Sequence, residues 1–388
     1  MAEEIAIGGI AVPLSHPDKV LFPGDGITKE DLARYYADAA GAMLPWLRDR
    51  PITMVRYPDG LSGQRFFQKN APSYFPGWIR RAEVAKEGGR VEHAVCDQPA
   101  TLVYLANQAC IEIHAFTSRA DKPDRPDQMV FDFDPPEDKR FADVRRAALR
   151  ARDLLDDGLG LTSFVRTSGG RGLHVHVALN RRAGFEAVRE FAHRVAGVLA
   201  RRYPDAVTTE QRKDKRGERI YIDVMRNAYA QTVAASYGVR ARPGAPVATP
   251  LSWAEVADDD LEPGRFTTTT VRARLDGGQG PWADFTGSAR GLGEAGRVVA
   301  AFGDGGVAGR GDTAPAAHVL ATLNEPAQLI PLGMLLAGPP GREGDSRQPY
   351  GQRHHDDHAY DPDPGRGSCH GNPLLDYLFR CPYPGSQG

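Results

Sequence analysis

Three short segments alternate apolar side chains with acids or histidines, and this alternation constrains the fold more than any other feature of the chain. Residues 129–134 (MVFDFD), 173–177 (LHVHV) and 220–224 (IYIDV) each carry an apolar residue at every second position. Successive side chains of a strand point to opposite faces, so each segment is predicted to be a strand with one apolar and one polar face. Apolar faces of this kind pack on helices, which indicates an α/β (α+β) fold.

Segments with helical periodicity supply the elements that would cover such a sheet. Thr28 followed by Asp31 resembles a capping arrangement ahead of an apolar helical face that runs from Leu32 to Leu47. Further helices are expected over residues 141–156 and 185–203. Beyond about residue 303 the composition shifts to Gly, Pro, Asp and His, which cannot bury enough apolar surface to offset the entropy of ordering. We therefore predict a low-complexity, disordered tail over residues 301–388.

The polar faces of the three strands carry residues suited to metal chemistry. If the strands are neighbours in one sheet, three carboxylates and one or two histidines converge on the uncovered face of that sheet. These residues are Asp132, Asp134, Asp223, His174 and His176, of which His176 is interpreted as structural. Carboxylates at positions i and i+2 repel each other unless a cation lies between them, and oxygen ligands suit Mg²⁺ or Mn²⁺. A third carboxylate would allow two ions, as in in-line phosphoryl displacement. For Asp-x-Asp alone, plain acids at a strand end and a glycosyltransferase site remain alternatives.

A glycine-rich turn, residues 167–174 (TSGGRGLH), lies between the acidic segments. Its glycines permit a tight turn whose backbone N–H groups point inward as a nest for phosphate oxygens. Ser168, Arg171 and His174 supply further donors. A plain hairpin can have the same composition, but the position between two acidic strands favours a triphosphate site.

The overall charge gives little support to nucleic-acid binding, because the formal net charge is −2 at pH 7. Residues 210–219 (EQRKDKRGER) nevertheless hold five basic residues in ten, either as a solvated loop or as a strand-binding loop. No apolar run approaches the length of a membrane span, so we expect a cytoplasmic, nucleoid-associated location and no membrane partner. Cys96 and Cys110 are expected to be buried, reduced thiols.

The chain resembles the polymerase domain of bacterial ligase D, including its stand-alone relatives, a branch of the archaeo-eukaryotic primase superfamily. The resemblance rests on stretches that occur in the same order: HPDKVLFPGDGITKEDLARYY, RFFQKNAP, ACIEIHAFTSRAD, VFDFDPP, TSGGRGLHVHV, YIDVMRNA and SYGVRARPGAPVATPLSW. It covers about residues 10–300. It implies a DNA-end-binding α/β part in residues 1–120 and an RRM-like primase palm, a sheet with helices on one face, in residues 121–300.

The resemblance also implies roles for individual residues. The catalytic metal ligands would be Asp132, Asp134 and Asp223, which would hold two ions with Mn²⁺ favoured over Mg²⁺. The incoming nucleotide would be bound by His114, Ser168, Gly169, Arg171, His174, Arg240 and Arg242. DNA would be bound by Lys19, Lys29, Phe66, Phe67, Lys69, Arg226 and Asn227, with Lys19 and Lys29 on a 5′-phosphate and the phenylalanines stacked on template bases. Many relatives have lysine in place of Arg171, so the triphosphate geometry there is expected to differ.

These expectations combine into a template-directed nucleotidyltransferase that adds an NTP or dNTP to a 3′-hydroxyl at a DNA break or gap, in non-homologous end joining or gap repair. No Lys-x-Asp-Gly motif for covalent adenylation is present, so a separate DNA ligase and a Ku-type end-binding protein are the expected partners. Two alternatives stay open: a primase that starts strands de novo, and a non-catalytic DNA-end-binding module. A nucleotide-sugar glycosyltransferase would explain neither the third acid nor the glycine-rich turn.

Overall fold

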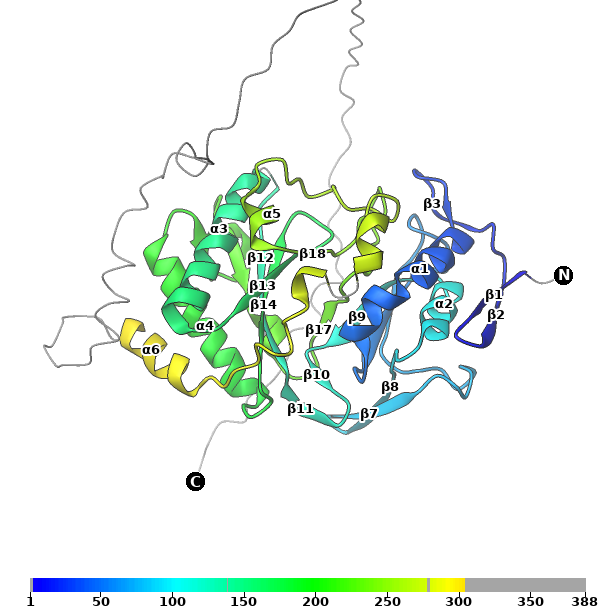
Figure 1. Cartoon of the computed structure of the whole chain (residues 1–388), viewed down its shortest axis with the longest axis horizontal. Helices are drawn as coiled ribbons and strands as arrows, with labels where there is room; N and C mark the ends of the chain where they lie inside the picture. The colour runs from blue at the N-terminus through cyan, green and yellow to red at the C-terminus, as the bar shows by residue number, and fades with distance from the viewer. Residues whose placement is uncertain (1–2, 138, 278–279, 304–388) are drawn as a thin grey trace, which may run out of the picture. The chain divides into compact units, whose positions relative to one another are not determined.

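A six-stranded sheet holds the three alternating segments side by side in this computed structural model, which describes residues 3–137, 139–277 and 280–303 (Figure 1). Its order is β15 (Val207–Thr208), β16 (Ile220–Asp223), β12 (Gln128–Asp134), β14 (Leu173–Ala178), β13 (Ser163–Thr167) and β18 (Pro250–Leu251). All neighbours are antiparallel except β15 and β16. The three predicted strands are confirmed, and they are neighbours.

Two helices, α3 (Phe141–Asp153) and α4 (Phe185–Arg202), cover one face of this sheet (Figure 1). On that face Met129, Phe131 and Phe133 of β12 are fully buried, and each contributes about 1.5–3 kcal/mol of hydrophobic stabilisation. Both helices were predicted. The first is shorter than expected, because the chain changes to a π-helical turn at Leu154–Gly158.

The opposite face of the sheet is covered along part of its length. Val130, His174 and His176 on that face are buried. The indole ring of Trp282 closes over it, with its centroid 4.9 Å from that of His176. The expectation of an uncovered polar face is therefore wrong at the His176 end, because a distant segment of the chain returns across it. The same face is more open at the acids, where Asp132 and Asp223 are partly exposed and Asp134 is exposed.

A second, four-stranded sheet lies beside the first, in the order β17 (Thr232–Ala234), β9 (Cys110–Phe116), β5 (Ile52–Arg56) and β6 (Phe66–Gln68). Helices α1 (Lys29–Leu47) and α2 (Pro99–Asn107) pack against each other beside it (Figure 1). The predicted capping box is confirmed: the Thr28 hydroxyl accepts from the Asp31 N–H at 3.2 Å, and the Asp31 carboxylate accepts from the Thr28 N–H at 2.8 Å. Helix α1 therefore begins directly after Thr28, the cap residue that the sequence predicts.

Contacts between distant segments join the two sheets. Strand β17 lies between β16 and β18 of the first sheet in sequence but pairs with β9 of the second sheet. The Tyr35 hydroxyl of α1 donates to the Tyr237 carbonyl at 2.7 Å, across 202 positions of sequence. One apolar core runs through both sheets. The boundary expected near residue 120 stays a prediction, and the predicted tail lies outside the described residues from 304 onward.

The remaining elements are short. The two-stranded hairpins are β1 (Glu3–Ile7) with β2 (Ile10–Leu14), β3 (Val20–Phe22) with β4 (Ile27–Thr28), β7 (Arg81–Lys86) with β8 (Gly89–Ala94), and β10 (Ser118–Arg119) with β11 (Lys122–Pro126). The short helices are α5 (Trp253–Ala257) and α6 (Gly293–Gly303), and the 3₁₀ turns are Lys213–Lys215, Met225–Asn227, Arg272–Gly277 and Gly280–Trp282. Cys96 and Cys110 are buried free thiols, as predicted.

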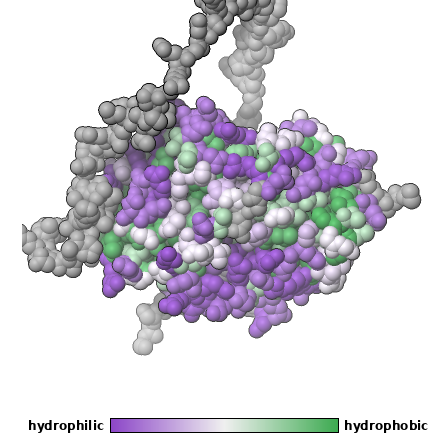
Figure 2. Space-filling model, in the orientation of Figure 1, coloured by the Kyte–Doolittle hydropathy of each residue, from purple (hydrophilic) through white to green (hydrophobic). Residues whose placement is uncertain are grey.

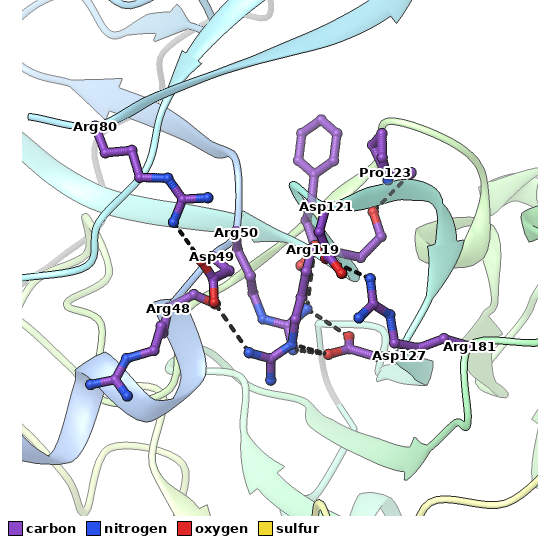
Figure 3. Close-up of polar contacts among 11 residues, drawn as sticks. Arg48, Asp49, Arg50, Arg80, Arg119, Asp121, Pro123, Asp127 and Arg181 are labelled. Atoms are coloured by element: carbon purple, nitrogen blue, oxygen red, sulfur yellow. Dashed lines mark hydrogen bonds and ion pairs between the residues drawn. The ribbon is translucent and has the colours of Figure 1, made fainter.

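An ion-pair network connects the end of α1 to the start of β12 (Figure 3). The Arg50 guanidinium donates two hydrogen bonds of 2.7 Å to the Asp127 carboxylate. Arg119 of β10 adds a third at 2.8 Å. Arg50 also donates to the carbonyl of Phe116, the last residue of β9, at 3.1 Å. Because Asp127 directly precedes β12, the network ties the acid-bearing strand to the second sheet.

Hydrophilic side chains cover much of the face of the described residues seen in Figure 2, with smaller apolar patches between them. Within the described ranges, no helix combines the length and the apolar character needed to cross a membrane.

Candidate active site

Strand pairing places functional side chains on both sides of Asp132. Its Cα partner on β16 is Asp223, and its Cα partner on β14 is His174. Asp134 lies two positions further along β12 and therefore on the same face. The register brings together three acids and a histidine that come from three separate segments of the sequence.

The negative charges of these carboxylates repel one another. Burial would raise the pKa of Asp132, but His174, with Arg226 and Arg240, holds that pKa below its usual value. The pKa values of Asp134 and Asp223 are raised, first by burial and also by the charge of Asp132. Within the described part of the chain, no three His, Cys, Asp or Glu side chains are already arranged to hold an ion. The acids nevertheless fit a divalent cation in donor type, and such a cation would relieve their repulsion.

A basic side chain approaches these acids from the segment 210–219. Arg216 Nη1 lies 3.7 Å from Asp134 Oδ2, and the guanidinium carbon lies 3.8 Å from the centroid of the Tyr221 ring. The carbonyls of Glu210 and Gln211 accept hydrogen bonds from the same guanidinium at 2.9 and 2.8 Å. This segment therefore folds back toward the acids.

The glycine-rich turn is closed by its own serine. The Ser168 hydroxyl oxygen accepts from the Gly170 and Gly172 N–H groups at 3.1 and 3.2 Å. These two N–H groups are therefore not open as the predicted phosphate nest. Gly169 has a φ of +65°, and a Cβ there would lie 2.4 Å from Cγ of Arg240. Glycine is required at this position both by its backbone conformation and by close packing.

Two cationic side chains extend from the region of the turn. Arg171 is exposed, with its guanidinium donating to the Glu137 carbonyl at 2.9 Å. Arg242, also exposed, lies against Gly170, where a Cβ would be 3.3 Å from Cζ of the arginine. Both guanidinium groups are thus accessible beside the turn, as the predicted nucleotide-binding role requires.

Glu112 joins two predicted site residues, His114 and Arg240, that lie far apart in the sequence. Its carboxylate contacts His114 Nε2 at 2.7 Å and accepts from Arg240 Nε at 3.1 Å and from the Ala241 N–H at 2.9 Å. Arg240 in turn donates to the carbonyl of Ser168. Burial would raise the pKa of Glu112, but His114 and Arg240 lower it to about 2. The ionised carboxylate therefore links β9 to the glycine-rich turn.

His174 has a second buried neighbour, Arg166 of β13. One guanidinium nitrogen lies 3.1 Å from His174 Nδ1. The other ring nitrogen, Nε2, lies 3.4 Å from Asp132 Oδ1. Arg166 and Glu112 are both absent from the predicted site. For Glu112 the available signal was strand alternation, because it lies two positions before His114. Arg166 is brought to His174 by the pairing of β13 with β14, which the sequence does not show.

The two lysines predicted to hold a 5′-phosphate lie at one cavity of about 290 Å³, which is also lined by Ser15, Arg56 and Asn107. Lys29 is buried at the first position of α1, where its ammonium group donates to the Ser15 carbonyl. Burial and the nearby charge of Lys19 lower the pKa of Lys29. Lys19 makes an ion pair of 3.4 Å with the exposed Asp59. Two cations beside a helix N-terminus make this cavity suited to an anion.

The adjacent phenylalanines of β6 both face solvent. Phe66 is 45% exposed and Phe67 is 63% exposed, and the guanidinium carbon of Arg65 lies 5.3 Å from the Phe67 ring centroid. Lys69 and Phe67 line a cavity of about 410 Å³ beside the β7–β8 hairpin. Both rings are therefore accessible on the edge strand β6, as the predicted stacking role requires.

Arg226 and Asn227 differ in their surroundings. Arg226 is partly exposed near the acids. Asn227 is fully buried, and its amide makes hydrogen bonds of 2.8 and 2.7 Å with the N–H and carbonyl of Val130. Asn227 therefore clamps β12 and does not face the surface, so a direct DNA contact is not supported for it. His176 bonds Gln128 at 3.0 Å within the core, consistent with a structural role.

Comparisons with known proteins add to this geometry. The family model described as LigD, primase-polymerase domain, matches residues 28–282. The bifunctional non-homologous end joining protein LigD of Bacillus subtilis is 34% identical over 269 residues, which are 69% of this chain and 43% of that protein. The multifunctional non-homologous end joining protein LigD of Pseudomonas aeruginosa is 33% identical over 289 residues, 74% of this chain and 34% of that protein. The chain thus spans less than half the length of these relatives.

A solved structure is similar over most of the chain. The polymerase domain of Mycobacterium tuberculosis ligase D, in complex with DNA, superposes with a TM-score of 0.67 at 31% sequence identity. The match covers 72% of this chain and 99% of that domain.

Proposed function

Because the chain belongs to the LigD primase-polymerase domain family, we propose that it is a template-directed nucleotidyltransferase that extends 3′-hydroxyl ends at DNA breaks or gaps. The observation that carries the proposal is the register that puts Asp132 opposite Asp223, with Asp134 on the same face. The relatives named as non-homologous end joining proteins, and the neighbour bound to DNA, support a role in that repair process or in gap filling.

The acids would hold two divalent ions, with Asp132 and Asp223 facing each other across paired strands and Asp134 at the open end. When bound, Mn²⁺ or Mg²⁺ supplies charge neutralisation at the attacking 3′-oxygen and at the departing pyrophosphate. No protein side chain is required as a dedicated base.

The nucleotide would lie between the glycine-rich turn and the acids. Arg171 and Arg242, which are exposed beside the turn, would bind its phosphate oxygens. His174, beside Asp132, would donate a hydrogen bond to the same polyphosphate. Glu112 holds His114 and Arg240 in place for contacts with the sugar and phosphates. Ser168 would act through the shape of the turn, since its oxygen already accepts two backbone N–H groups.

The DNA end would bind on the side of the four-stranded sheet and helix α1, away from the acids. The cavity with Lys19 and Lys29 would bind a 5′-phosphate, and the exposed rings of Phe66 and Phe67 would stack on template bases. A Ku-type protein and a separate DNA ligase would complete end joining as partners.

Nucleotide incorporation on a gapped, 5′-phosphorylated DNA with Mn²⁺ tests this proposal. The intact chain should extend the primer, and Asp132→Asn should lose extension by more than about 100-fold because the central acid is gone. The matched control is Asp124→Asn, an exposed acid whose ion pair in the described part of the chain is with its neighbour Arg125, and this variant should extend normally.

Two other outcomes would indicate a different activity. Extension that needs no primer would instead identify a primase that starts strands. DNA binding without any extension, by well-folded intact protein and with any nucleotide, would leave an end-binding module and overturn the polymerase proposal.

A further inference from the structure

Arg166 is a buried arginine without a carboxylate partner. It is 2% exposed, and within the described part of the chain its contacts are to Ser236 Oγ at 3.2 Å and to His174 Nδ1 at 3.1 Å. Its Nε has no hydrogen-bond partner. Burial lowers the pKa of Arg166 to about 9, with repulsion from Arg240 adding to this, so the guanidinium still carries its charge at neutral pH. A charge buried without an ionised partner lowers the stability of the folded state.

The contact with His174 determines which ring nitrogen carries the proton. A guanidinium has only donors, so the Nδ1 atom that faces it must accept. A neutral imidazole with Nδ1 as the acceptor carries its hydrogen on Nε2. That Nε2 lies 3.4 Å from Asp132 Oδ1, on the side of the acids. The pairing of β13 with β14 places Arg166 directly opposite His174, so the arrangement is built into the sheet.

We propose that Arg166 is a positioning residue that holds His174 as the Nε2–H tautomer and directs this N–H, backed by a buried positive charge, toward the polyphosphate of the nucleotide. The inference rests on the proposed function only in taking the anion to be a nucleotide polyphosphate. The hydrogen-bond partner of Nε2 would then change from Asp132 to a phosphate oxygen when the nucleotide binds. The incoming anion would also stabilise the otherwise unpaired guanidinium.

A purely structural role for Arg166 predicts different behaviour. If the guanidinium served only to hold the strands together, replacing it with an apolar side chain of similar length would lower the unfolding temperature and leave the imidazole unchanged. If it is held there for function, Arg166→Met removes a costly buried charge, and the unfolding temperature should be unchanged or higher.

The first test reads the tautomer directly. In the full chain with ¹⁵N-labelled histidine, without metal or nucleotide, the His174 signals should show a protonated Nε2 and an unprotonated Nδ1. The assignment comes from their loss in His174→Gln. In Arg166→Met the pattern should become a mixture of tautomers, and in Arg166→Lys, which keeps a charged donor, it should return.

The second test measures anion binding by calorimetry with inorganic pyrophosphate at fixed Mg²⁺. Arg166→Met should bind pyrophosphate about tenfold more weakly than the intact protein, as expected for the loss of a charge-assisted interaction, and Arg166→Lys should recover most of the affinity. Arg145→Met is the matched control: this buried arginine bonds the carbonyl of Val256 and the carboxylate of Asp259. It should lower the unfolding temperature and leave pyrophosphate binding unchanged.

Either of two results would overturn the inference: a proton on Nδ1 of His174 in the intact protein, or unchanged His174 signals and pyrophosphate affinity in Arg166→Met. Absence of nucleotide incorporation, with the predicted tautomer and pyrophosphate binding intact, would count against the polymerase proposal alone.

Discussion

Glu112 contacts partners from two distant parts of the chain. One carboxylate oxygen meets His114 on the same strand, and the other accepts from Arg240 and from the Ala241 N–H. Hydrogen bonds to an ionised, buried carboxylate are among the stronger polar interactions in proteins. At the residue scale, these contacts keep two predicted nucleotide ligands in fixed positions before any ligand arrives.

The pKa of Glu112 predicts a defined pH dependence of stability. Since folding lowers this pKa from 4.5 to about 2, the carboxylate stabilises the folded state above pH 4.5, and the stabilisation is lost as pH falls toward 2. At pH 7, Glu112→Gln should reduce the free energy of unfolding by about 3 kcal/mol. Urea denaturation between pH 3 and 7 measures the difference, which should shrink toward acid pH.

An exposed acid provides the control for this measurement. Glu83 pairs with Arg90 on the surface hairpin, and both side chains are exposed. Glu83→Gln should change the free energy of unfolding by less than about 1 kcal/mol at every pH. A difference for Glu112→Gln that stays constant from pH 7 to 3 would contradict the assigned role of its charge.

At the element scale, the glycine-rich turn packs directly on the acid-bearing strand. A Cβ at Gly172 would lie 2.4 Å from the carbonyl oxygen of Phe133, which lies between the two acids of β12. Backbone atoms cannot move away as the end of a flexible side chain can. The spacing between β14 and β12 at this point therefore depends on the absence of a side chain.

Gly172→Ala should force the two strands apart beside the acids. We expect a loss of about 1–3 kcal/mol in the free energy of unfolding, together with a larger relative loss of nucleotide incorporation, because Asp134 is displaced. Gly77→Ala is the control, since a Cβ there meets nothing within 4 Å. Equal stability and equal activity of the two variants would show that the spacing between β14 and β12 does not depend on glycine at position 172.

At the scale of the whole described molecule, a small group of buried polar side chains bridges the two sheets in addition to their shared apolar core. Arg50 bonds the carboxylate that precedes β12 and the carbonyl that ends β9. Burial would raise the pKa of Asp127, but Arg50 and Arg119 hold it below its usual value. This network fixes the acids relative to the sheet that carries His114.

Removal of Asp127, the acid that Arg50 and Arg119 share, should therefore lower the free energy of unfolding substantially. Asp127→Ala leaves the buried guanidinium of Arg50 without its partner, and we expect a loss of about 3–5 kcal/mol in the free energy of unfolding. Asp124→Ala, at an exposed ion pair, should cost less than about 1 kcal/mol. Thermal and urea denaturation of the two variants at pH 7 provide the comparison; similar values for both would mean that the buried network contributes little.

The sequence by itself determined the local features of this protein. The alternation in β12, β14 and β16, the Thr28 cap and the order of the family's motifs were all legible, because strand faces and helix starts depend on neighbours a few positions apart. Only the tertiary structure decided which side chains meet across the fold. Glu112 and Arg240 are 128 positions apart, Asn227 turned inward to bond Val130, and Trp282 covered a face expected to be open. Such partners depend on how distant segments pack, and local periodicity carries no record of that packing.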